Sequence, residues 1–332
     1  MRLFDNEDIG VADPGIEPEN PCCSLADIED ARAVCNRLGI PYYVFNFTDT
    51  FAEQVIERFI EAYERGWTPN PCIDCNRFLK FERLLKRAHE IGFDHVATGH
   101  YARVAYDGRA GRYLLKRGID RNKDQSYVLY GMTQSQLAHT LFPLGELTKE
   151  QTREIAREQG FSTAEKSESQ DICFVRGHDY GAFIRHYTGR AFESGNLVDT
   201  QGKPIGTHQG IIDFTVGQRK GIGIAAAQPL YVTEIIPETA TVVVGKEADL
   251  YRRIALVEDV NLIACEALEQ PLRATAKHRY RSTEVPAVVT QIDEGRLEVV
   301  FDEPQKAITK GQALVIYDDD VVIGGGTIAD VR

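Results

Sequence analysis

The sequence predicts an α/β N-terminal domain followed by antiparallel β structure, and three observations lead to this prediction. Up to about residue 159, stretches with helical spacing of apolar residues alternate with short β-branched and aromatic runs, which is typical of a parallel sheet covered by helices. From Leu197 onward, short alternating segments are separated by turn residues, as in small antiparallel barrels. The length of 332 residues, with 43% hydrophobic residues, leaves room for two or three domains.

The elements of the first part follow from capping residues and apolar spacing. A helix is expected over Ser24–Leu38, because Ser24 can cap it and Gly39 can end it. Further helices are expected at residues 49–65, 76–91, 149–159 and 178–187. Tyr42–Phe47 is expected to be a buried strand, and His95–Tyr101 a strand that runs into a turn.

The second part is expected to contain mainly short strands, at residues 241–244, 256–260, 287–292, 297–301 and 313–317. We therefore divide the chain into an α/β domain at 1–175, a small central domain at 176–249 and a C-terminal antiparallel β-barrel at 250–332.

Composition limits the classes of function. No apolar run approaches the roughly 20 residues that span a bilayer, and the first residues lack a signal-peptide pattern, so we expect a cytoplasmic protein without a membrane partner. Seven cysteines in that compartment are expected to be reduced, catalytic or metal-binding. The net charge of −12 argues against non-specific polyanion binding. Basic residues nevertheless cluster between Arg103 and Lys123 and around Tyr280.

Two cysteine-containing stretches are the candidates for chemistry. Cys72 and Cys75 lie in Pro69-Asn-Pro-Cys-Ile-Asp-Cys-Asn76, which we expect to be a rigid loop ahead of a helix that begins near Asn76. The positive end of a helix lowers the pKa of a nearby thiol and favours the reactive thiolate. Cys173 lies in a second polar stretch about one hundred residues later. A Cys-x-x-Cys pair alone also fits half of a zinc site or two buried thiols.

Six ordered motifs carry a resemblance to a known family. They are Pro69-Asn-Pro-Cys-Ile-Asp-Cys-Asn76, Ala97-Thr-Gly-His-Tyr101, Asn122-Lys-Asp-Gln-Ser126, Asp171-Ile-Cys-Phe174, Val216-Gly-Gln-Arg-Lys-Gly-Ile222 and Lys277-His-Arg-Tyr-Arg281. In this order they resemble the bacterial tRNA-specific 2-thiouridylases of the ATP-pyrophosphatase (PP-loop) superfamily, over nearly the whole chain. The resemblance implies an adenine nucleotide alpha hydrolase-like α/β domain, a small central domain and a C-terminal β-barrel.

The resemblance also implies a reaction. Such enzymes use ATP to adenylate the C2 oxygen of the wobble uridine of tRNA, and then replace that oxygen with sulfur. By motif match Cys173 is the persulfide carrier, and Cys75 is the nucleophile that releases the sulfur through a transient disulfide. The implied partners are tRNAs for lysine, glutamate and glutamine, and a persulfide sulfur-carrier protein or cysteine desulfurase.

The same match assigns binding residues. Met1 and Gly99 are expected at the ATP site, with Mg²⁺ accompanying ATP. Three residues, Asn70, Pro71 and Cys72, are expected to border the flipped target base. Further contacts with tRNA are expected from His100, Lys123, Asp124, Gln125, Arg279, Tyr280 and Gln312.

The sequence departs from the family pattern at two places. It has no Ser-Gly-Gly-Val-Asp-Ser stretch for the ATP phosphates, and Met1 matches the end of the family's second strand, so the first strand is missing. Either the natural protein begins upstream, which we expect, or the phosphates are bound in another way. Cys72 stands where many relatives carry an aspartate that has been viewed as a proton-transfer group, and Asp74 is a weak substitute for it.

Two alternatives remain at this point. Cys72, Cys75 and Cys173 could ligate three irons of a [4Fe–4S] cluster that serves tRNA thiolation. A catalytically impaired, truncated fragment could instead bind tRNA without ATP turnover.

Overall fold

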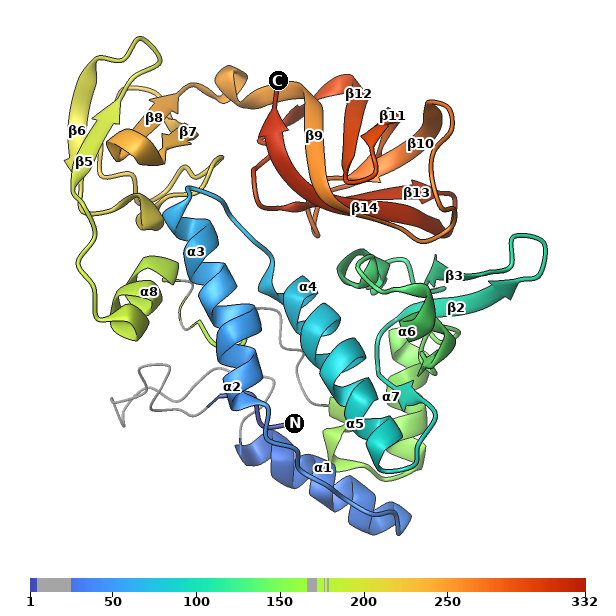
Figure 1. Cartoon of the computed structure of the whole chain (residues 1–332). Coiled ribbons are helices and arrows are strands. Elements are labelled where there is room, and N and C mark those ends of the chain that lie inside the picture. Colours follow the sequence, from blue (N-terminus) through green and yellow to red (C-terminus); the bar gives the residue numbers. More distant parts are fainter. Residues whose placement is uncertain (5–24, 166–171, 176, 178) are drawn as a thin grey trace.

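The structure, a computed structural model, describes residues 1–4, 25–165, 172–175, 177 and 179–332. Helices dominate the N-terminal part, a small sheet follows in the centre of the sequence, and a β-barrel ends the chain (Figure 1). The α/β N-terminal region, the small central region and the antiparallel barrel confirm the predicted fold class. Among the described residues, no helix is both long enough and apolar enough to cross a membrane.

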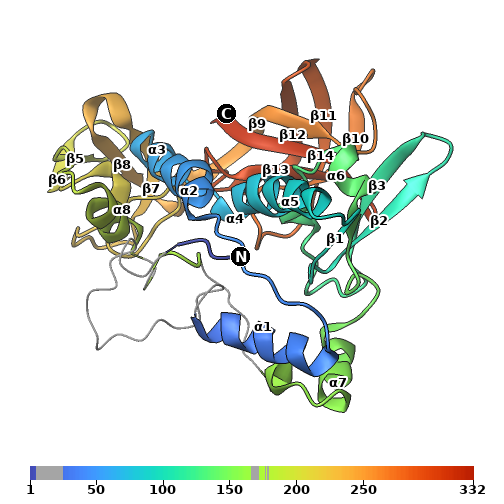
Figure 2. The same cartoon turned by 60° about the horizontal axis from the view of Figure 1, so that its bottom comes forward.

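Two long helices run side by side through the N-terminal region (Figure 1). The first consists of α2 (Thr48–Phe51), the π-helical segment η1 (Ala52–Glu57) and α3 (Arg58–Glu64). The second consists of α4 (Pro71–Asp74), the π-helical segment η2 (Cys75–Arg83) and α5 (Leu84–Glu90). Helix α1 (Leu25–Leu38) lies below them in Figure 2, and Ser24, its expected cap, lies outside the described residues.

The second long helix begins earlier than predicted, at Pro71 rather than near Asn76. The Asn70 side chain caps it, because its Oδ1 accepts a hydrogen bond from the Cys72 amide at 3.2 Å. Proline is well suited to the first helical position, where its missing N–H leaves no helical bond unmade. The prediction that both cysteines lie on a loop ahead of the helix is therefore wrong, since Cys72 and Cys75 are part of the helix.

Parallel pairing is present in the N-terminal region, but the strands are short. Strand β1 (Val96–Ala97) pairs in parallel with β4 (Thr140–Leu141), and an isolated parallel bridge joins Arg2 to Asn46. The predicted buried strand at 42–47 is wrong apart from this bridge, because Tyr43 is 63% exposed and Val44 is 46% exposed. Strand propensity needs a ladder partner and a covered face, and the described residues supply neither along most of this segment.

The remaining helices are short and connect the larger units. They are the α-helices α6 (Gln134–Ala138), α7 (Lys149–Glu158) and α8 (Tyr180–Thr188), and the 3₁₀ turns η3 (Ser126–Leu129), η4 (Ser162–Glu165), η5 (Ile211–Asp213), η6 (Pro237–Thr239) and η7 (Glu247–Leu250). The helices predicted at 149–159 and 178–187 correspond to α7 and α8.

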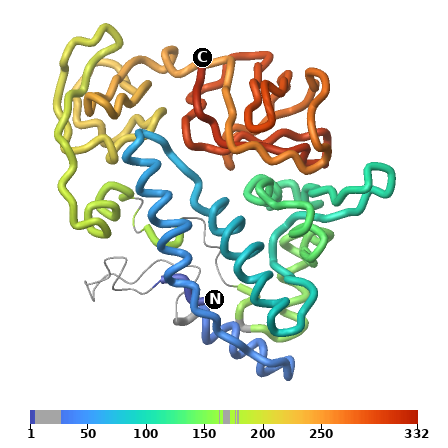
Figure 3. Tube along the Cα trace, viewed as in Figure 1, coloured from blue at the N-terminus to red at the C-terminus, as the bar shows by residue number. Residues whose placement is uncertain are grey.

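The central sheet has the order β6 (Pro204–His208), β5 (Gly195–Val198), β8 (Thr241–Gly245), β7 (Tyr231–Ile236). The barrel comprises β9 (Tyr251–Leu262), β10 (Leu272–Lys277), β11 (Val285–Asp293), β12 (Arg296–Lys306), β13 (Ala313–Asp318) and β14 (Val321–Val331), and β13–β14 pairing closes it. Figure 3 shows how the chain passes from the central sheet into this barrel. The predicted strands of both units are confirmed.

A hairpin of the N-terminal region extends the barrel sheet, which the sequence did not indicate. It consists of β2 (Ala102–Asp107) and β3 (Arg112–Arg117), and Lys116 of β3 pairs with Val321 of β14. The hydroxyl of fully buried Tyr127 donates to the Ala313 carbonyl of the barrel at 2.8 Å. The Asn261 amide of the barrel donates to the Tyr130 and Met132 carbonyls at 2.6 and 3.0 Å. These contacts fix the barrel on the N-terminal region.

An aromatic cluster anchors the segment that carries Cys173. Phe174 is 1% exposed, and its ring lies edge-on against Phe51 and Phe59 at centroid distances of 5.6 and 5.4 Å. The Phe183 ring of α8 also makes a tilted contact with the Phe174 ring, at a centroid distance of 5.2 Å. Rings from the first long helix and from α8 therefore enclose Phe174 and hold its neighbour Cys173 in place.

Replacing Phe174 with alanine should lower the free energy of unfolding by about 3–5 kcal/mol, because it leaves a cavity inside a packed aromatic cluster. Urea denaturation followed by fluorescence or circular dichroism measures this change. Phe93→Ala is the matched control, since Phe93 is 58% exposed and its loss should cost under about 1 kcal/mol. Equal effects of the two substitutions would contradict the role given to Phe174.

Candidate active site

The predicted cysteines line one cavity of about 390 Å³, called here the cysteine cavity. Its walls come from α1, from the two long helices and from the segment 172–174. The lining residues are Met1, Leu3, Asp27, Ile28, Ala31, Tyr42, Tyr43, Phe51, Val55, Pro71, Cys72, Cys75, Lys80, Ile172, Cys173 and Phe174. Five residues predicted from the sequence thus share one cavity: Met1, Pro71, Cys72, Cys75 and Cys173.

The three cysteines of this cavity carry thiols, and they differ in exposure. Cys72 is exposed in the first turn of the helix, whereas Cys75 and Cys173 are half-buried. Cys173 is held from the side by Phe174, and Cys75 by the helix that Asn70 caps. Two thiols from distant segments in one largely apolar cavity are suited to sulfur chemistry that excludes water.

The placement of these three cysteines does not support metal binding. Cys72, Cys75 and Cys173 all belong to the part of the chain that the structure describes. Within that part, no group of three His, Cys, Asp or Glu side chains is arranged to hold a metal ion.

Asn70 lines a neighbouring cavity of about 460 Å³ between the helices and the barrel. There Arg77 of η2 pairs with Asp259 of β9 at 2.6 Å, and Arg58 lies 3.6 Å from Asp74. Burial raises the pKa of Asp74 to about 6, although the nearby Arg58 and Arg77 act in the opposite direction. The helix that carries Cys75 is therefore joined to the barrel by charged side chains.

Gly99 and His100 follow β1 and lie outside the lining of the cysteine cavity. A Cβ added to Gly99 would meet only the Leu144 side chain, at 3.6 Å, so the protein leaves space beside this backbone. His100 is 8% exposed, and its Nδ1 lies 2.7 Å from the Thr98 hydroxyl. Burial, aided by the charge of Lys80, lowers the pKa of His100 to about 3, so this imidazole is neutral near pH 7.

The loop with Lys123, Asp124 and Gln125 is shaped by its own side chains. The Asp124 carboxylate accepts hydrogen bonds from the Gly118 amide at 3.1 Å and from the Ser126 hydroxyl at 2.8 Å. The Gln125 Oε1 accepts from the Tyr101 amide at 3.0 Å, next to His100. Asp124 and Gln125 thus hold this loop against β3 and the segment after β1.

The predicted barrel residues lie in two groups. Arg279 donates to the Ala307 carbonyl and to the Thr309 hydroxyl, while Tyr280 is 37% exposed beside the Tyr127 ring, at 5.8 Å. The Gln312 amide donates to the Thr68 carbonyl at 2.6 Å, two residues before Asn70. The barrel therefore contacts the segment that leads into the second long helix, which carries Cys72 and Cys75 and is called here the cysteine helix.

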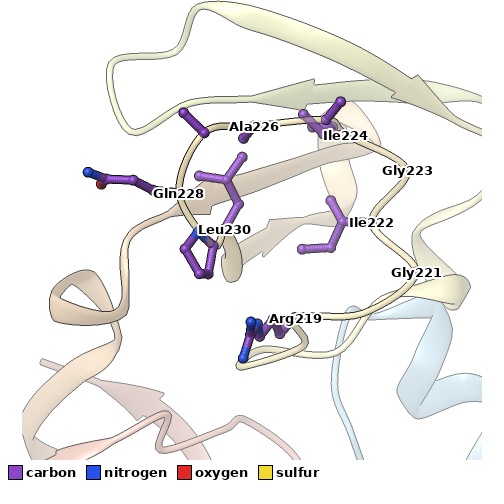
Figure 4. Close-up of a pocket in the computed structure, with 11 residues that line it drawn as sticks. Arg219, Gly221, Ile222, Gly223, Ile224, Ala226, Gln228 and Leu230 are labelled. Atoms are coloured by element: carbon purple, nitrogen blue, oxygen red, sulfur yellow. The ribbon is translucent and has the colours of Figure 1, made fainter.

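The basic run at Gly217–Gly221 forms part of a third cavity, of about 620 Å³ (Figure 4). One continuous loop, residues 219–230, supplies its whole lining. Arg219 and Gln228 are the polar side chains of this lining, and the rest are glycine, alanine, proline, isoleucine and leucine. Although larger, this cavity has no nucleophile or acid, so the cysteine cavity is the candidate active site.

Sequence reasoning missed Lys80 and Asp27, which supply the charged side chains of the cysteine cavity. Lys80 follows Cys75 by five residues, a spacing that an α-helix places on different faces. The π-helical winding of η2 changes this relation, and no signal in the sequence announced it.

The fold and the cavity define a multidomain protein whose candidate site is lined by three cysteines. Comparison with known families gives three matches: "tRNA methyl transferase HUP domain" at residues 10–177, "tRNA methyl transferase PRC-barrel domain" at 181–246 and "Aminomethyltransferase beta-barrel domain" at 252–328. The chain is 47% identical over 328 residues to the tRNA-specific 2-thiouridylase MnmA of Clostridioides difficile, covering 99% of this chain and 89% of that protein.

Two further relatives carry the same name. The chain is 51% identical over 310 residues to the protein of Acetivibrio thermocellus, covering 93% of this chain and 86% of that protein. It is 50% identical over 307 residues to the protein of Carboxydothermus hydrogenoformans, covering 92% and 84%. The descriptions of two matching families use the term methyl transferase, whereas the names of the relatives use the term thiouridylase. Identities of 47%, 51% and 50% over nearly the whole chain show that it belongs to the tRNA-specific 2-thiouridylase family.

Replacing His100 with glutamine should make folding less sensitive to acid. In the unfolded chain this histidine protonates near its usual pKa of 6.5, whereas in the folded chain it stays neutral down to about 3. The folded state therefore loses stability as the pH falls from about 6 to 4, by about 1.4 kcal/mol per pH unit for this residue.

Urea denaturation at several pH values should show that slope reduced in His100→Gln. Exposed His186 offers a matched control, because His186→Gln should leave the slope as it is in the unaltered chain. An unchanged slope in His100→Gln would contradict a buried, neutral imidazole.

Proposed function

We propose that this chain is a tRNA 2-thiouridylase that replaces the C2 oxygen of the wobble uridine with sulfur. The observation that carries this proposal is the placement of Cys75 and Cys173, which are about one hundred residues apart in sequence, in one cavity beside Pro71 and Cys72. The names of relatives near 50% identity over nearly the whole chain support the same reaction class.

The proposed reaction has an activation step and a sulfur-transfer step. ATP adenylates the C2 oxygen and releases pyrophosphate, so that AMP becomes the leaving group. The terminal sulfur of a persulfide on Cys173 attacks C2 and forms the C–S bond. The Cys75 thiolate then attacks Sγ of Cys173, and the S–S bond breaks with its electron pair on the transferred sulfur. Expulsion of AMP leaves the thiocarbonyl, and an external dithiol reduces the Cys75–Cys173 disulfide.

The walls of the cysteine cavity suit this chemistry. Phe51, Val55, Ile172 and Phe174 give it an apolar side, which limits hydrolysis of an activated uridine and loss of the persulfide to solvent. Cys72 is exposed at the helix start, where an incoming base would pass it. The target base must leave its stack to enter, as for other enzymes that modify bases.

ATP is proposed to bind next to the same cavity, with Mg²⁺ on its phosphates. Met1 lines the cavity, and the open space beside the Gly99 backbone fits a nucleotide that approaches the main chain. Bound ATP supplies the adenylate that activates the uridine. Met1 and Gly99 would hold and orient its adenosine part.

The RNA is proposed to lie across the barrel and the loop at Lys123–Gln125. Tyr280 offers an exposed ring for stacking, and the Lys277 ammonium lies 5.6 Å from the centre of that ring. Arg279 and Gln312 serve this face mainly by holding the loops 307–309 and 68–70 in place. Within the proposed division, residues 1–175 perform the chemistry, while 176–249 and 250–332 bind RNA.

The remaining assignments follow from this function. The tRNAs for lysine, glutamate and glutamine are the proposed substrates, and a persulfide carrier protein or cysteine desulfurase is the proposed donor of sulfur. Both belong to the cytoplasm, which is the proposed location.

Sulfur transfer should fail in Cys75→Ser and in Cys173→Ser, while tRNA binding stays close to that of the unaltered chain. The assay mixes the 332-residue chain, ATP, Mg²⁺, a persulfide donor and a tRNA anticodon stem-loop, and measures 2-thiouridine by mass spectrometry of nucleosides. Cys75→Ser should accumulate persulfide on Cys173, because the thiolate that releases the sulfur is gone. Cys265→Ser is the control, since Cys265 lies in the barrel, outside the cysteine cavity.

Thiolation retained in either cysteine variant would contradict the assignment. Cys72→Ser separates the persulfide route from the [4Fe–4S] route, because only a cluster enzyme would lose iron and activity together. Absence of 2-thiouridine with the unaltered protein would contradict the proposed function itself.

Tyr280→Ala should weaken binding of the stem-loop by about tenfold or more, because stacking of one base contributes about 1–3 kcal/mol. Lys123→Ala should instead reduce, by about one, the steepness of the plot of log binding constant against log salt concentration. This is the change expected for the loss of one phosphate contact. Fluorescence anisotropy at several salt concentrations measures both effects. Exposed Tyr251, the first residue of β9, gives the control Tyr251→Ala. Equal salt slopes and affinities in all three variants would contradict the proposed RNA face.

A further inference from the structure

Lys80 supplies a cation to a cavity that is mostly apolar. The lining of the cysteine cavity contains two charged side chains, Asp27 on α1 and Lys80 on η2. The other lining residues, apart from the three cysteines, are apolar or aromatic. Charges interact more strongly where apolar side chains replace water, so this ammonium can affect any anion formed in the cavity.

The winding of the helix explains why Lys80 reaches the same cavity as Cys75. In an α-helix, residues five apart are rotated by about 140° from one another, because each residue turns the chain by about 100°. In a π-helix the hydrogen bonds join residues five apart, so such residues lie nearly above one another. Cys75 opens the π-helical segment Cys75–Arg83, and Lys80 is five residues further on.

The neighbours of Lys80 leave its charge available to the cavity. His100 is near enough for the Lys80 charge to disfavour its protonation, so that imidazole is neutral and brings no competing cation. Asp27 faces the cavity from the opposite element, α1. Lys80 is therefore the basic side chain of this lining, and it belongs to the same helix and the same cavity as the Cys75 thiol.

We propose that Lys80 is a further catalytic residue, whose ammonium stabilises the anionic sulfur during its release from Cys173. This inference rests on the proposed function. In the release step negative charge leaves the Cys75 thiolate as the new disulfide forms, and it appears on the sulfur that is transferred. Lys80 faces the cavity in which both sulfurs lie, so it stabilises the charge before and after the step. Lys80 transfers no proton in this step.

Alkylation of the 332-residue chain with two reagents tests this proposal without tRNA or ATP. Neutral iodoacetamide and anionic iodoacetate are compared at pH 7, and the rate at Cys75 is read from its peptide by mass spectrometry. Lys80→Gln should slow alkylation of Cys75 by about tenfold, because a nearby cation favours the reactive thiolate, and should slow iodoacetate more than iodoacetamide. Lys80→Arg should keep both rates close to those of the unaltered chain.

Lys86→Gln is the matched control, because Lys86 is an exposed lysine further along the same helix and outside the cysteine cavity. A structural disturbance would change the alkylation rates with both reagents by the same factor. Loss of a cation would instead change the ratio of the iodoacetate rate to the iodoacetamide rate. Lys80→Met replaces Lys80→Gln if the latter fails to fold. Unchanged rates and an unchanged ratio in a folded Lys80 variant would overturn the proposal. Failure of the unaltered chain to thiolate tRNA would overturn the proposed function and leave this readout intact.

Discussion

The start of the helix at Asn70 is the constraint on which the candidate site depends. The Asn70 cap and Pro71 at the first helical position fix where the helix begins, and thereby fix the direction of every side chain that follows. Cys72 then lies in the first turn and Cys75 at the start of the π-helical segment. A helix that began near Asn76 would leave both thiols on an irregular segment without a defined orientation toward Cys173.

The opposite wall of the cavity depends on packing rather than on capping. Cys173 has no long element of its own, and its neighbour Phe174 enters a cluster of rings from α2, α3 and α8. Burial of the Phe174 ring therefore fixes the position of Cys173, just as the helix fixes the position of Cys75. The two thiols are therefore held by separate supports, a capped helix for Cys75 and a buried ring next to Cys173.

Elements with a clear apolar periodicity and residues in ordered motifs could be predicted from the sequence. Features that depend on tertiary contacts could not. The barrel strands and helix α7 carry strong local patterns, and they occur where expected. The helix start at Pro71 was missed because proline was taken as a breaker, although its position relative to Asn70 makes it an initiator. Lys80 was missed because a π-helical segment leaves no periodic signature. Tyr42–Phe47 has strand propensity, but the described residues pair only its end, at Asn46.

The barrel and the cysteine helix meet at a contact that tolerates only one kind of residue. Gly311 has a φ of +86°, and a Cβ on it would lie 2.8 Å from Trp67 Cβ and 2.9 Å from the Thr68 amide nitrogen. Its neighbours complete the junction, since Lys310 and Gln312 bond the Thr68 amide and carbonyl at 2.9 and 2.6 Å. Thr68 lies directly before Pro69 and the Asn70 cap. The barrel, which is proposed to bind RNA, is therefore joined by hydrogen bonds to the residues that begin the cysteine helix, so this one junction sets the position of the barrel relative to Cys75.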